Sequence, residues 1–168
     1  MTLKQAELHE LFRSGGAADI IKVSDELLPI QEKDISLWRS RSITVWSAVV
    51  SALCWVRDNE GEKTSLEIFV QNTGLSPIER LYLKGLDISI GNGGVWPVAF
   101  HGVKDYLETY LPGYSIKTLL ENKLRELSAQ CDMVKEAHNY TAAGLTPLLY
   151  AVNPVQVPAD FLVDSQHA

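Results

Sequence analysis

Apolar residues are most concentrated between Arg41 and Arg57, where the fourteen residues from Ile43 to Val56 carry no charge. A helix of that length would measure about 21 Å, which is shorter than the hydrocarbon core of a bilayer at about 30 Å. In water, a helix that is apolar on nearly every side needs partner helices on several faces. The pattern therefore predicts a buried central helix over about 34–58 in a multi-helix body, and not a membrane span.

Shorter amphipathic segments surround this stretch, and residues typical of helix ends separate them. Thr64 with Glu67, and Ser76 with Glu79, match capping boxes, in which a hydroxyl and a carboxylate satisfy backbone N–H groups at a helix start. Pro77 suits the first helical position of the second box. The predicted helices span 2–14, 17–28, 64–73, 77–86 and 96–110.

From residue 115 onward, apolar side chains and one histidine recur at steps of three and four, which is typical of one face of a helix. The positions are Ile116, Leu120, Leu124, Leu127, Cys131, Val134 and His138. This spacing predicts a long C-terminal helix over about 115–143, which Thr146-Pro147 either restarts or kinks. Hydrophobic positions then alternate, so 154–168 is predicted to be a short extended tail. The predicted fold class is all-α, with residues 1–168 in a single helical domain.

Composition and charge narrow the possible partners. Hydrophobic residues make up 46% of the chain and charged residues 21%, as in ordinary globular proteins. The 15 basic and 21 acidic residues give a net charge of −6, and they form no basic stripe for a phosphate backbone. Cys54 and Cys131 lie in apolar helical patterns, which favours reduced thiols in a cytoplasmic protein. The N-terminus shows no signal-peptide pattern.

The residues that could carry chemistry do not form a known catalytic pattern. The glycine-rich stretch from Gly91 to Gly94 is not a phosphate-binding loop of the Walker A type, because the chain contains no Gly-Lys pair. Cys131 and His138 would lie about 10 Å apart on one helix, too far for a catalytic thiolate pair. We interpret them as a core cysteine and a partly exposed histidine. The sequence predicts no catalytic residue, no cofactor and no metal site.

Three motifs occur in the same order as in type IV secretion coupling proteins of the IncI-plasmid and Dot/Icm-like branch. The first is a W-[KR]-x-R-[AS] helix that ends in an aromatic-x-R-D-x-G turn, the second a short helix-and-cap segment, and the third Y-L-x-x-L-P-G-Y. The corresponding residues of the first and third are Trp38, Arg39, Arg41, Ser42, Trp55, Arg57, Asp58, Gly61, Tyr106, Leu107, Leu111, Pro112, Gly113 and Tyr114. The chain has one residue more than these patterns between Asp58 and Gly61, and again between Leu107 and Leu111. The segment "TSLEIFVQNTGLSPIERL" resembles the second, and "VNPVQVPADFLVDS" resembles the family's return into a core strand.

This resemblance implies an excised piece of a larger protein, because Walker A, Walker B and the membrane helices of the family are absent from the chain. The piece would be the all-α domain inserted in the RecA-like motor of a membrane-anchored, homo-hexameric ATPase. It would recruit a relaxase, a relaxosome or secreted protein substrates, and it would also contact the motor domain. The parent would hold it in the cytoplasm at the inner face of the bacterial inner membrane. The fragment itself would not be an enzyme or insert into the membrane, and DNA would touch it only with help from other domains.

Two other functions remain open from the sequence. The chain could be a free-standing cytoplasmic helical adaptor or regulator, or a small helical enzyme. For partner contact the sequence favours the glycine-rich stretch and the residues just after it, namely Asn92, Trp96, Phe100 and His101, because a tryptophan beside a loop is a suitable anchor. The alternative is that Trp96 closes the core under that loop. A Trp96→Ala variant that loses partner capture without a lower melting temperature would favour the first interpretation.

Overall fold

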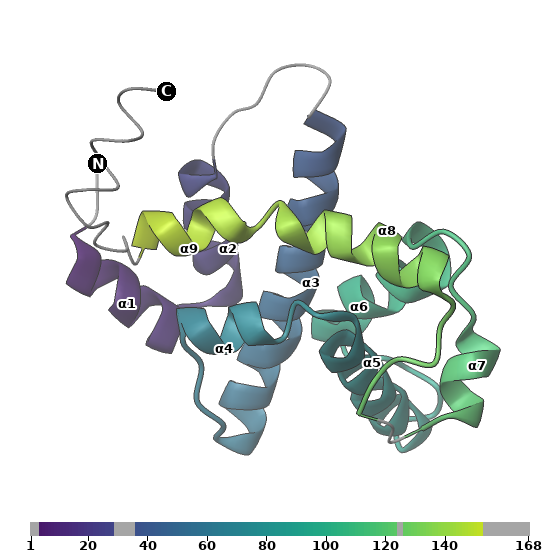
Figure 1. Cartoon of the computed structure of the whole chain (residues 1–168). Helices are drawn as coiled ribbons and strands as arrows, with labels where there is room; N and C mark the ends of the chain where they lie inside the picture. Colours follow the sequence, from purple (N-terminus) through teal and green to yellow (C-terminus); the bar gives the residue numbers. More distant parts are fainter. Residues whose placement is uncertain (1–3, 29–35, 124–125, 153–168) are drawn as a thin grey trace, which may run out of the picture.

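The chain folds as a set of helices packed around one central helix (Figure 1). A computed structural model describes residues 4–28, 36–123 and 126–152, and none of these lies in a β-strand. The elements are α1 (Gln5–Ser14), α2 (Ala17–Leu27), α3 (Ser36–Glu60), α4 (Leu66–Gln71), α5 (Leu75–Ile90), the 3₁₀ helix η1 (Val98–Phe100), α6 (His101–Asp105), the π-helix η2 (Tyr106–Tyr110), α7 (Ile116–Glu121), α8 (Asp132–Ala143) and α9 (Thr146–Val152). The predicted all-α fold class is confirmed.

Helix α3 is the central element, as the uncharged stretch predicts. It contacts α2, α4, α5, α6 and α8 along its length, and Figure 1 shows it running through the middle of the helices. Val45, Val49 and Ala52 have no exposed surface. The long apolar run is therefore buried by neighbouring helices, and no helix in the described ranges is both long and apolar enough to cross a bilayer.

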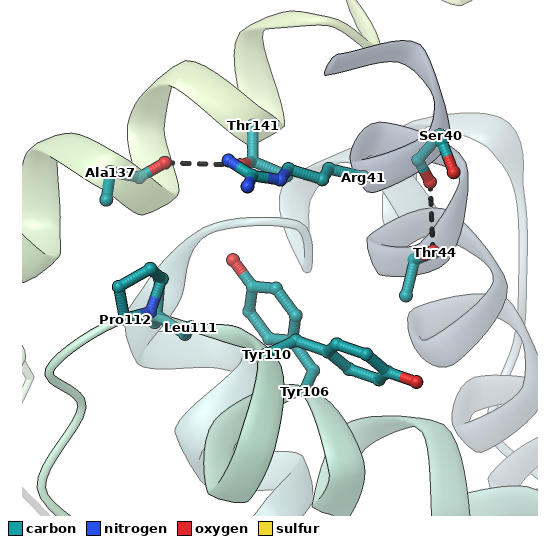
Figure 2. A pocket seen from close by; sticks show the side chains of 9 residues that line it. All are labelled: Ser40, Arg41, Thr44, Tyr106, Tyr110, Leu111, Pro112, Ala137 and Thr141. Carbon is teal, nitrogen blue, oxygen red and sulfur yellow. Dashed lines mark hydrogen bonds between the residues drawn. The ribbon is translucent and has the colours of Figure 1, made fainter. Parts of the chain in front are cut away.

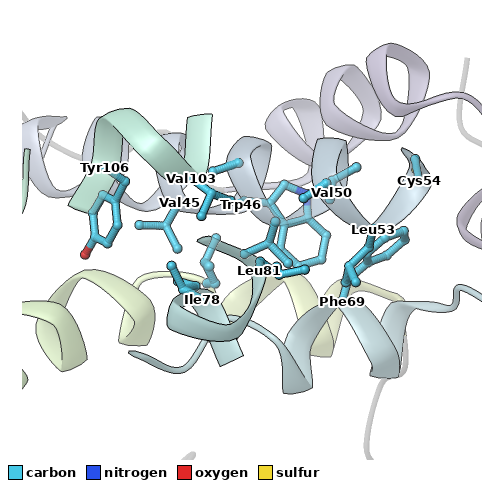
Figure 3. Close-up of a cluster of buried hydrophobic side chains, with 14 of the residues drawn as sticks. Val45, Trp46, Val50, Leu53, Cys54, Phe69, Ile78, Leu81, Val103 and Tyr106 are labelled. Atoms are coloured by element: carbon cyan, nitrogen blue, oxygen red, sulfur yellow. The ribbon is translucent and has the colours of Figure 1, made fainter. Parts of the chain in front are cut away.

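Two tryptophans of α3 connect it to different neighbours. Trp46 meets Phe12 of α1 edge to face, with ring centroids 6.5 Å apart. It meets Phe69 of α4 in the same way at 5.9 Å (Figure 3). Trp55 instead packs against Phe100 at 5.3 Å. Nine residues along an α-helix turn the side chain by about 180°, so the two indoles serve opposite sides of α3.

The predicted long helix over 115–143 is wrong. Helix α7 ends at Glu121 and α8 begins only at Asp132. Gln130 folds back on the start of α7, where its side chain accepts from the Ser115 N–H and donates to the Ser115 carbonyl, both at 2.9 Å. Leu127, expected on the apolar face, is 80% exposed. Two hydrogen bonds between residues that are fifteen positions apart thus join the residue before Cys131 to the start of α7, where a continuous helix was predicted.

The interpretation of Cys131 as a core residue is also wrong, because this cysteine is exposed just before α8. Cys54 is buried, as expected for a small hydrophobic residue, and burial raises the pKa of its thiol. Thr146-Pro147 restarts the chain as α9, one of the two outcomes that the sequence left open. The tail over 154–168 lies outside the described residues.

Both predicted helix starts are displaced. Ser65, and not Thr64, caps α4, and its hydroxyl accepts from the Ile68 N–H at 3.1 Å. The Thr64 hydroxyl is directed to the Phe12 carbonyl at 2.9 Å. Helix α5 begins two residues before the predicted position 77, so Pro77 lies inside its first turn, where a missing N–H costs nothing.

Candidate functional site

The glycine-rich stretch forms an exposed turn between α5 and η1. Gly93 and Gly94 have positive φ angles of 63° and 87°, a backbone region that favours glycine. The Gly94 N–H donates to the Ser89 carbonyl at 2.7 Å, and this bond closes the turn on the end of α5. Asn92 is exposed at the tip. The structure therefore presents Asn92 on a hydrogen-bonded turn.

The other three predicted contact residues lie at different depths. Trp96 is half-buried and packs on Tyr82 with ring centroids 5.1 Å apart. Phe100 is fully buried and offers no side-chain surface to a partner in this structure. His101 is exposed, and its Nε2 lies 3.2 Å from the Trp96 carbonyl oxygen. Trp96 therefore packs against the core under the turn, and its contact with a partner stays a prediction.

Three apolar side chains that the sequence did not single out are strongly exposed around this turn. Ile90, Val95 and Val98 are 70%, 62% and 81% exposed. Together with Asn92 we refer to them as the glycine-turn surface. In the sequence, Ile90 and Val95 flank the glycine-rich stretch, and Val98 follows three residues later. The sequence does not distinguish these exposed aliphatic residues from buried ones, and only the structure does.

A cavity of about 290 Å³ opens elsewhere, between α3, η2 and α8 (Figure 2). Its wall includes Arg41 and Thr44 of α3, Tyr106 and Tyr110 of η2, and Ala137 and Thr141 of α8. Leu111 and Pro112, which come directly after η2, complete its apolar side. The W-[KR]-x-R-[AS] and Y-L-x-x-L-P-G-Y motifs, which are far apart in the sequence, thus meet at one cavity.

Behind this cavity, a buried tyrosine–histidine pair fixes η2 against α8. Tyr106 Oη lies 2.7 Å from Nδ1 of His138, and His138 Nε2 lies 2.8 Å from the Thr73 carbonyl oxygen. Because a carbonyl only accepts, Nε2 carries the proton, and the neutral ring accepts the Tyr106 hydroxyl at Nδ1. Burial lowers the pKa of His138 and raises that of Tyr106, which keeps both groups neutral.

The expectation of a partly exposed His138 is therefore wrong, since this side chain has no exposed surface. On the same helix, the Thr141 carbonyl accepts from the buried Ser42 hydroxyl at 2.7 Å. Ser42 also lies against Gly144, where a Cβ atom would overlap its hydroxyl. His138 and Gly144, together with the sequence-distant Ser42 of α3, thus hold α8 to the core beside the cavity.

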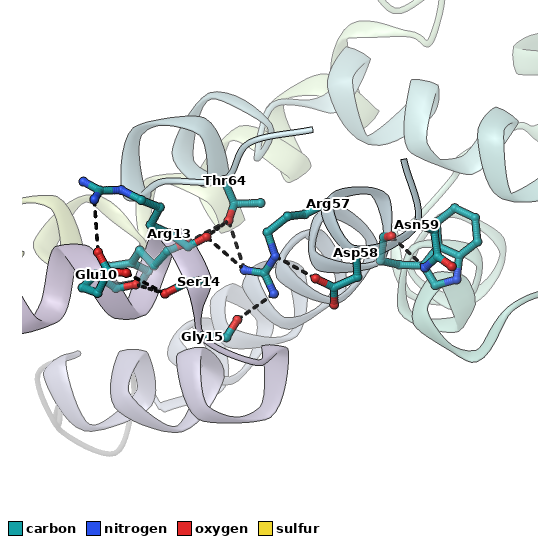
Figure 4. Close-up of polar contacts among 10 residues, drawn as sticks. Glu10, Arg13, Ser14, Gly15, Arg57, Asp58, Asn59 and Thr64 are labelled. Carbon is teal, nitrogen blue, oxygen red and sulfur yellow. Dashed lines mark hydrogen bonds and ion pairs between the residues drawn. The ribbon is translucent and has the colours of Figure 1, made fainter. Parts of the chain in front are cut away.

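The aromatic-x-R-D-x-G motif has a structural role at the other end of α3. The Arg57 guanidinium donates to the Gly15 carbonyl at 2.8 Å and the Arg13 carbonyl at 3.3 Å, at the end of α1 (Figure 4). Asp58 holds the same guanidinium through an ion pair at 2.9 Å. A cation that binds the last carbonyls of a helix also complements the helix dipole. The motif thus fastens α1 to α3.

A third polar cluster joins α5 to the turn before α8. The Glu79 carboxylate is buried, and it accepts a short hydrogen bond from the Tyr114 hydroxyl and a longer one, at 3.3 Å, from Ser128. Burial, and after it the hydrogen bond to Glu79, raises the pKa of Tyr114. Within the described residues, no group of three or more histidine, cysteine or acidic side chains is placed to hold a metal ion.

Comparison with known proteins adds no assignment to this geometry. No family model, curated protein or solved structure matches the chain. Function must therefore be inferred from the residues of the chain, from its three ordered motifs and from two places that the fold creates, the glycine-turn surface and the cavity between α3, η2 and α8.

Proposed function

We propose that this chain is the substrate-docking all-α domain of a conjugative or effector type IV secretion coupling protein. In that role it recruits relaxosome proteins or secreted protein substrates to a hexameric motor ATPase, and it hydrolyses no nucleotide itself. The resemblance in three ordered motifs points to the family. The glycine-turn surface is the observation that carries the docking role.

Exposed aliphatic side chains at one place are a feature of partner-binding surfaces. Ile90, Val95 and Val98 lie beside a turn that glycine geometry and the Gly94–Ser89 hydrogen bond hold in place. Trp96, which packs on Tyr82, supports this turn from below. A protein partner fits an apolar surface on a chain of net charge −6 better than bare DNA does.

The arrangement of the first and last described helices supports an origin as an inserted domain. Helix α9 packs against both α1 and α2, and Figure 1 shows α9 beside α1. A domain inserted in another needs its entry and exit close together, and neighbouring ends are what make such insertions tolerable. This contact is therefore in accord with a lobe that leaves and re-enters a motor domain.

The positions of the motif residues support the resemblance in a second way. Arg41, Ser42, Tyr106 and Leu111 lie around the cavity or against α8, next to one another in space. Arg57 fastens α3 to α1. Residues that recur together in a family are expected to form one structural unit, and here they connect the central helix to its neighbours.

The experiment that tests this function places a photo-activated crosslinking amino acid at Val98 in the complete protein, expressed in the bacterium that encodes it. We expect crosslinks to a relaxase or to a secreted substrate. Lys117, whose side chain is 85% exposed on α7, is the matched control position and should capture neither. Equal capture at both positions, or none at Val98 while transfer proceeds normally, would contradict docking at this surface.

A second measurement separates the coupling protein from the free-standing adaptor. Val98→Asp in the complete protein is expected to lower conjugation or effector secretion at least about tenfold, which corresponds to about 1.4 kcal/mol of lost binding. The melting temperature should stay unchanged, because Val98 is a surface residue. A reading frame without Walker A upstream and Walker B downstream of this segment would identify the adaptor instead.

A further inference from the structure

We infer that the cavity between α3, η2 and α8 is a binding site for a small organic carboxylate with a compact apolar body. This inference goes beyond the docking role, because the residues of the glycine-turn surface are not among those that line the cavity. Docking and carboxylate binding can therefore be tested separately, and either can fail without the other.

The size of the cavity limits its ligand. At about 290 Å³ it lies at the lower end of the range for small-molecule pockets, about 300–1,000 Å³. Leu111, Pro112 and Ala137 supply aliphatic surface, and Tyr106 supplies the face of a ring. One ring or one short aliphatic chain fits such a space, whereas a nucleotide does not.

The charge in the cavity selects the polar group of the ligand. Among the described residues that line it, Arg41 is the charged one, and Figure 2 shows its guanidinium extended from α3 to the Ala137 carbonyl, with which it forms a hydrogen bond. One carbonyl takes up only part of the five N–H donors of a guanidinium. A guanidinium presents a planar fork of N–H donors that matches the two oxygens of a carboxylate. The hydroxyls of Thr44 and Thr141 belong to the same wall and can orient the anion.

Arg41 also interacts electrostatically with Tyr106, another residue of the cavity lining. Burial raises the pKa of the Tyr106 hydroxyl, and the positive charge of Arg41 acts in the opposite direction. Arg41 is therefore within electrostatic reach of the buried end of the cavity. An anion beside Arg41 and an apolar body against Tyr106 can be held at the same time.

The π-helix is an independent sign of function at this place. In η2 the Leu111 N–H donates to the Tyr106 carbonyl, five residues back, at 2.9 Å. Such turns are rare and are found frequently at functional sites. Here the wide turn lets both Tyr106, which is buried, and Tyr110, which is exposed, line the cavity. The lining thus combines one buried and one exposed aromatic side chain.

The residues favour a carboxylate over a phosphate. Phosphate sites combine several backbone N–H groups, typically from a glycine-rich loop at a helix N-terminus, with more than one donor side chain. Within the described part of the chain, the lining of this cavity contains no glycine and one cation. The guanidinium would repel a cationic ligand, and a neutral ligand would gain no charge-assisted hydrogen bond from it.

The test is a titration of the full chain followed by ¹H–¹⁵N NMR, with phenylacetate and hexanoate as carboxylate probes. Phenylacetamide and phenethylamine are the matched neutral and cationic controls. We expect saturable shifts at Thr44, Ala137 and Thr141 for the acids, and about tenfold weaker binding for the amide, because a charge-assisted hydrogen bond is lost. Absence of saturable shifts for both acids in the millimolar range, or equal binding of acid and amide, would overturn the site.

Variants assign the binding to Arg41 and to the cavity. Arg41→Gln should remove the preference for acid over amide, whereas Arg80→Gln, at an exposed position on α5, should leave it intact. Ala137→Met, which fills the space, should abolish binding of both probes. Arg41→Lys, which keeps the charge and loses the fork, should retain part of the preference. An Arg41→Gln protein that binds acids as tightly as the unaltered chain would refute the inference.

Discussion

At the scale of single residues, His138 shows how a titratable group becomes part of the core. Both of its ring nitrogens are used, one by Tyr106 and the other by the Thr73 carbonyl. A protonated ring would place an N–H against the Tyr106 hydroxyl, and its charge would be buried between a hydroxyl and a carbonyl. Burial accordingly lowers the pKa of His138, and the hydrogen bond to Thr73 only partly opposes this shift.

This residue makes stability depend on pH. Because the pKa of His138 is lower in the folded state than in the unfolded chain, unfolding takes up a proton at mildly acidic pH. The contribution of neutral His138 to the free energy of unfolding is complete above about pH 6.5 and is lost as the pH falls below that value. We expect urea unfolding to show a decrease of up to about 1.4 kcal/mol per pH unit below pH 6.5 from this group.

Two variants isolate the contribution of His138 from those of other groups. His138→Gln should flatten the slope between about pH 6.5 and 5, while lowering stability at pH 7 by about 1–3 kcal/mol through lost hydrogen bonds. His101→Gln, at an exposed histidine, should keep the slope. If His138→Gln retains the full pH dependence, the titrating group lies elsewhere.

At the scale of elements, the packing of α5 against the segment before η1 depends on a glycine. A Cβ atom on Gly85 would lie 2.7 Å from the Trp96 ring and 2.9 Å from Phe100. Helix propensity alone would favour alanine over glycine there by about 1 kcal/mol. The close approach of two aromatic rings decides the outcome, because overpacking costs about 1–3 kcal/mol.

Gly85→Ala is therefore expected to destabilise the protein by up to about 2 kcal/mol, measured as the free energy of unfolding in denaturant. Gly91→Ala is the matched control. Its φ is −71° and its Cβ would meet only ordinary contacts at 3.6 Å or more, so it should be neutral or mildly stabilising. A Gly85→Ala protein as stable as Gly91→Ala would show that Trp96 does not pack tightly on α5.

At the scale of the whole molecule, α3 holds the N-terminal helices together through one side chain. Trp46 has no exposed surface and contacts both Phe12 of α1 and Phe69 of α4. Within the described residues, its Nε1 is the buried side-chain polar atom that has no hydrogen-bond acceptor. Burial of the indole thus stabilises the fold strongly through its apolar contacts, while the unsatisfied N–H destabilises it by a smaller amount.

Two substitutions of Trp46 distinguish the effect of the apolar contacts from the effect of the unsatisfied N–H. Trp46→Ala should cost about 3–5 kcal/mol, because it leaves a large cavity among three helices. Trp46→Phe keeps most of the contact and removes the unsatisfied N–H, so it should cost less than about 2 kcal/mol. Thermal and urea unfolding measure both variants, and equal losses would mean that the aromatic ring contributes little here.

The candidate site was predictable only in part. Glycines before Trp96 indicated a turn, and the turn with exposed Asn92 lies there. The burial of Phe100 and the exposure of Val98 were not readable, because both are apolar residues in one short helical segment. The cavity was not foreseeable either, since its walls come from α3, η2 and α8.

The sequence by itself determined the helical class, the buried course of α3 and the restart or kink at Pro147. These features depend on local properties, namely an uncharged run, a period of three to four, and residues that cannot continue a helix. Tertiary structure decided the break between α7 and α8, the burial of His138 and the role of Thr64. Each depends on hydrogen bonds between distant residues, such as Gln130 with Ser115 or His138 with Thr73, which no local pattern encodes.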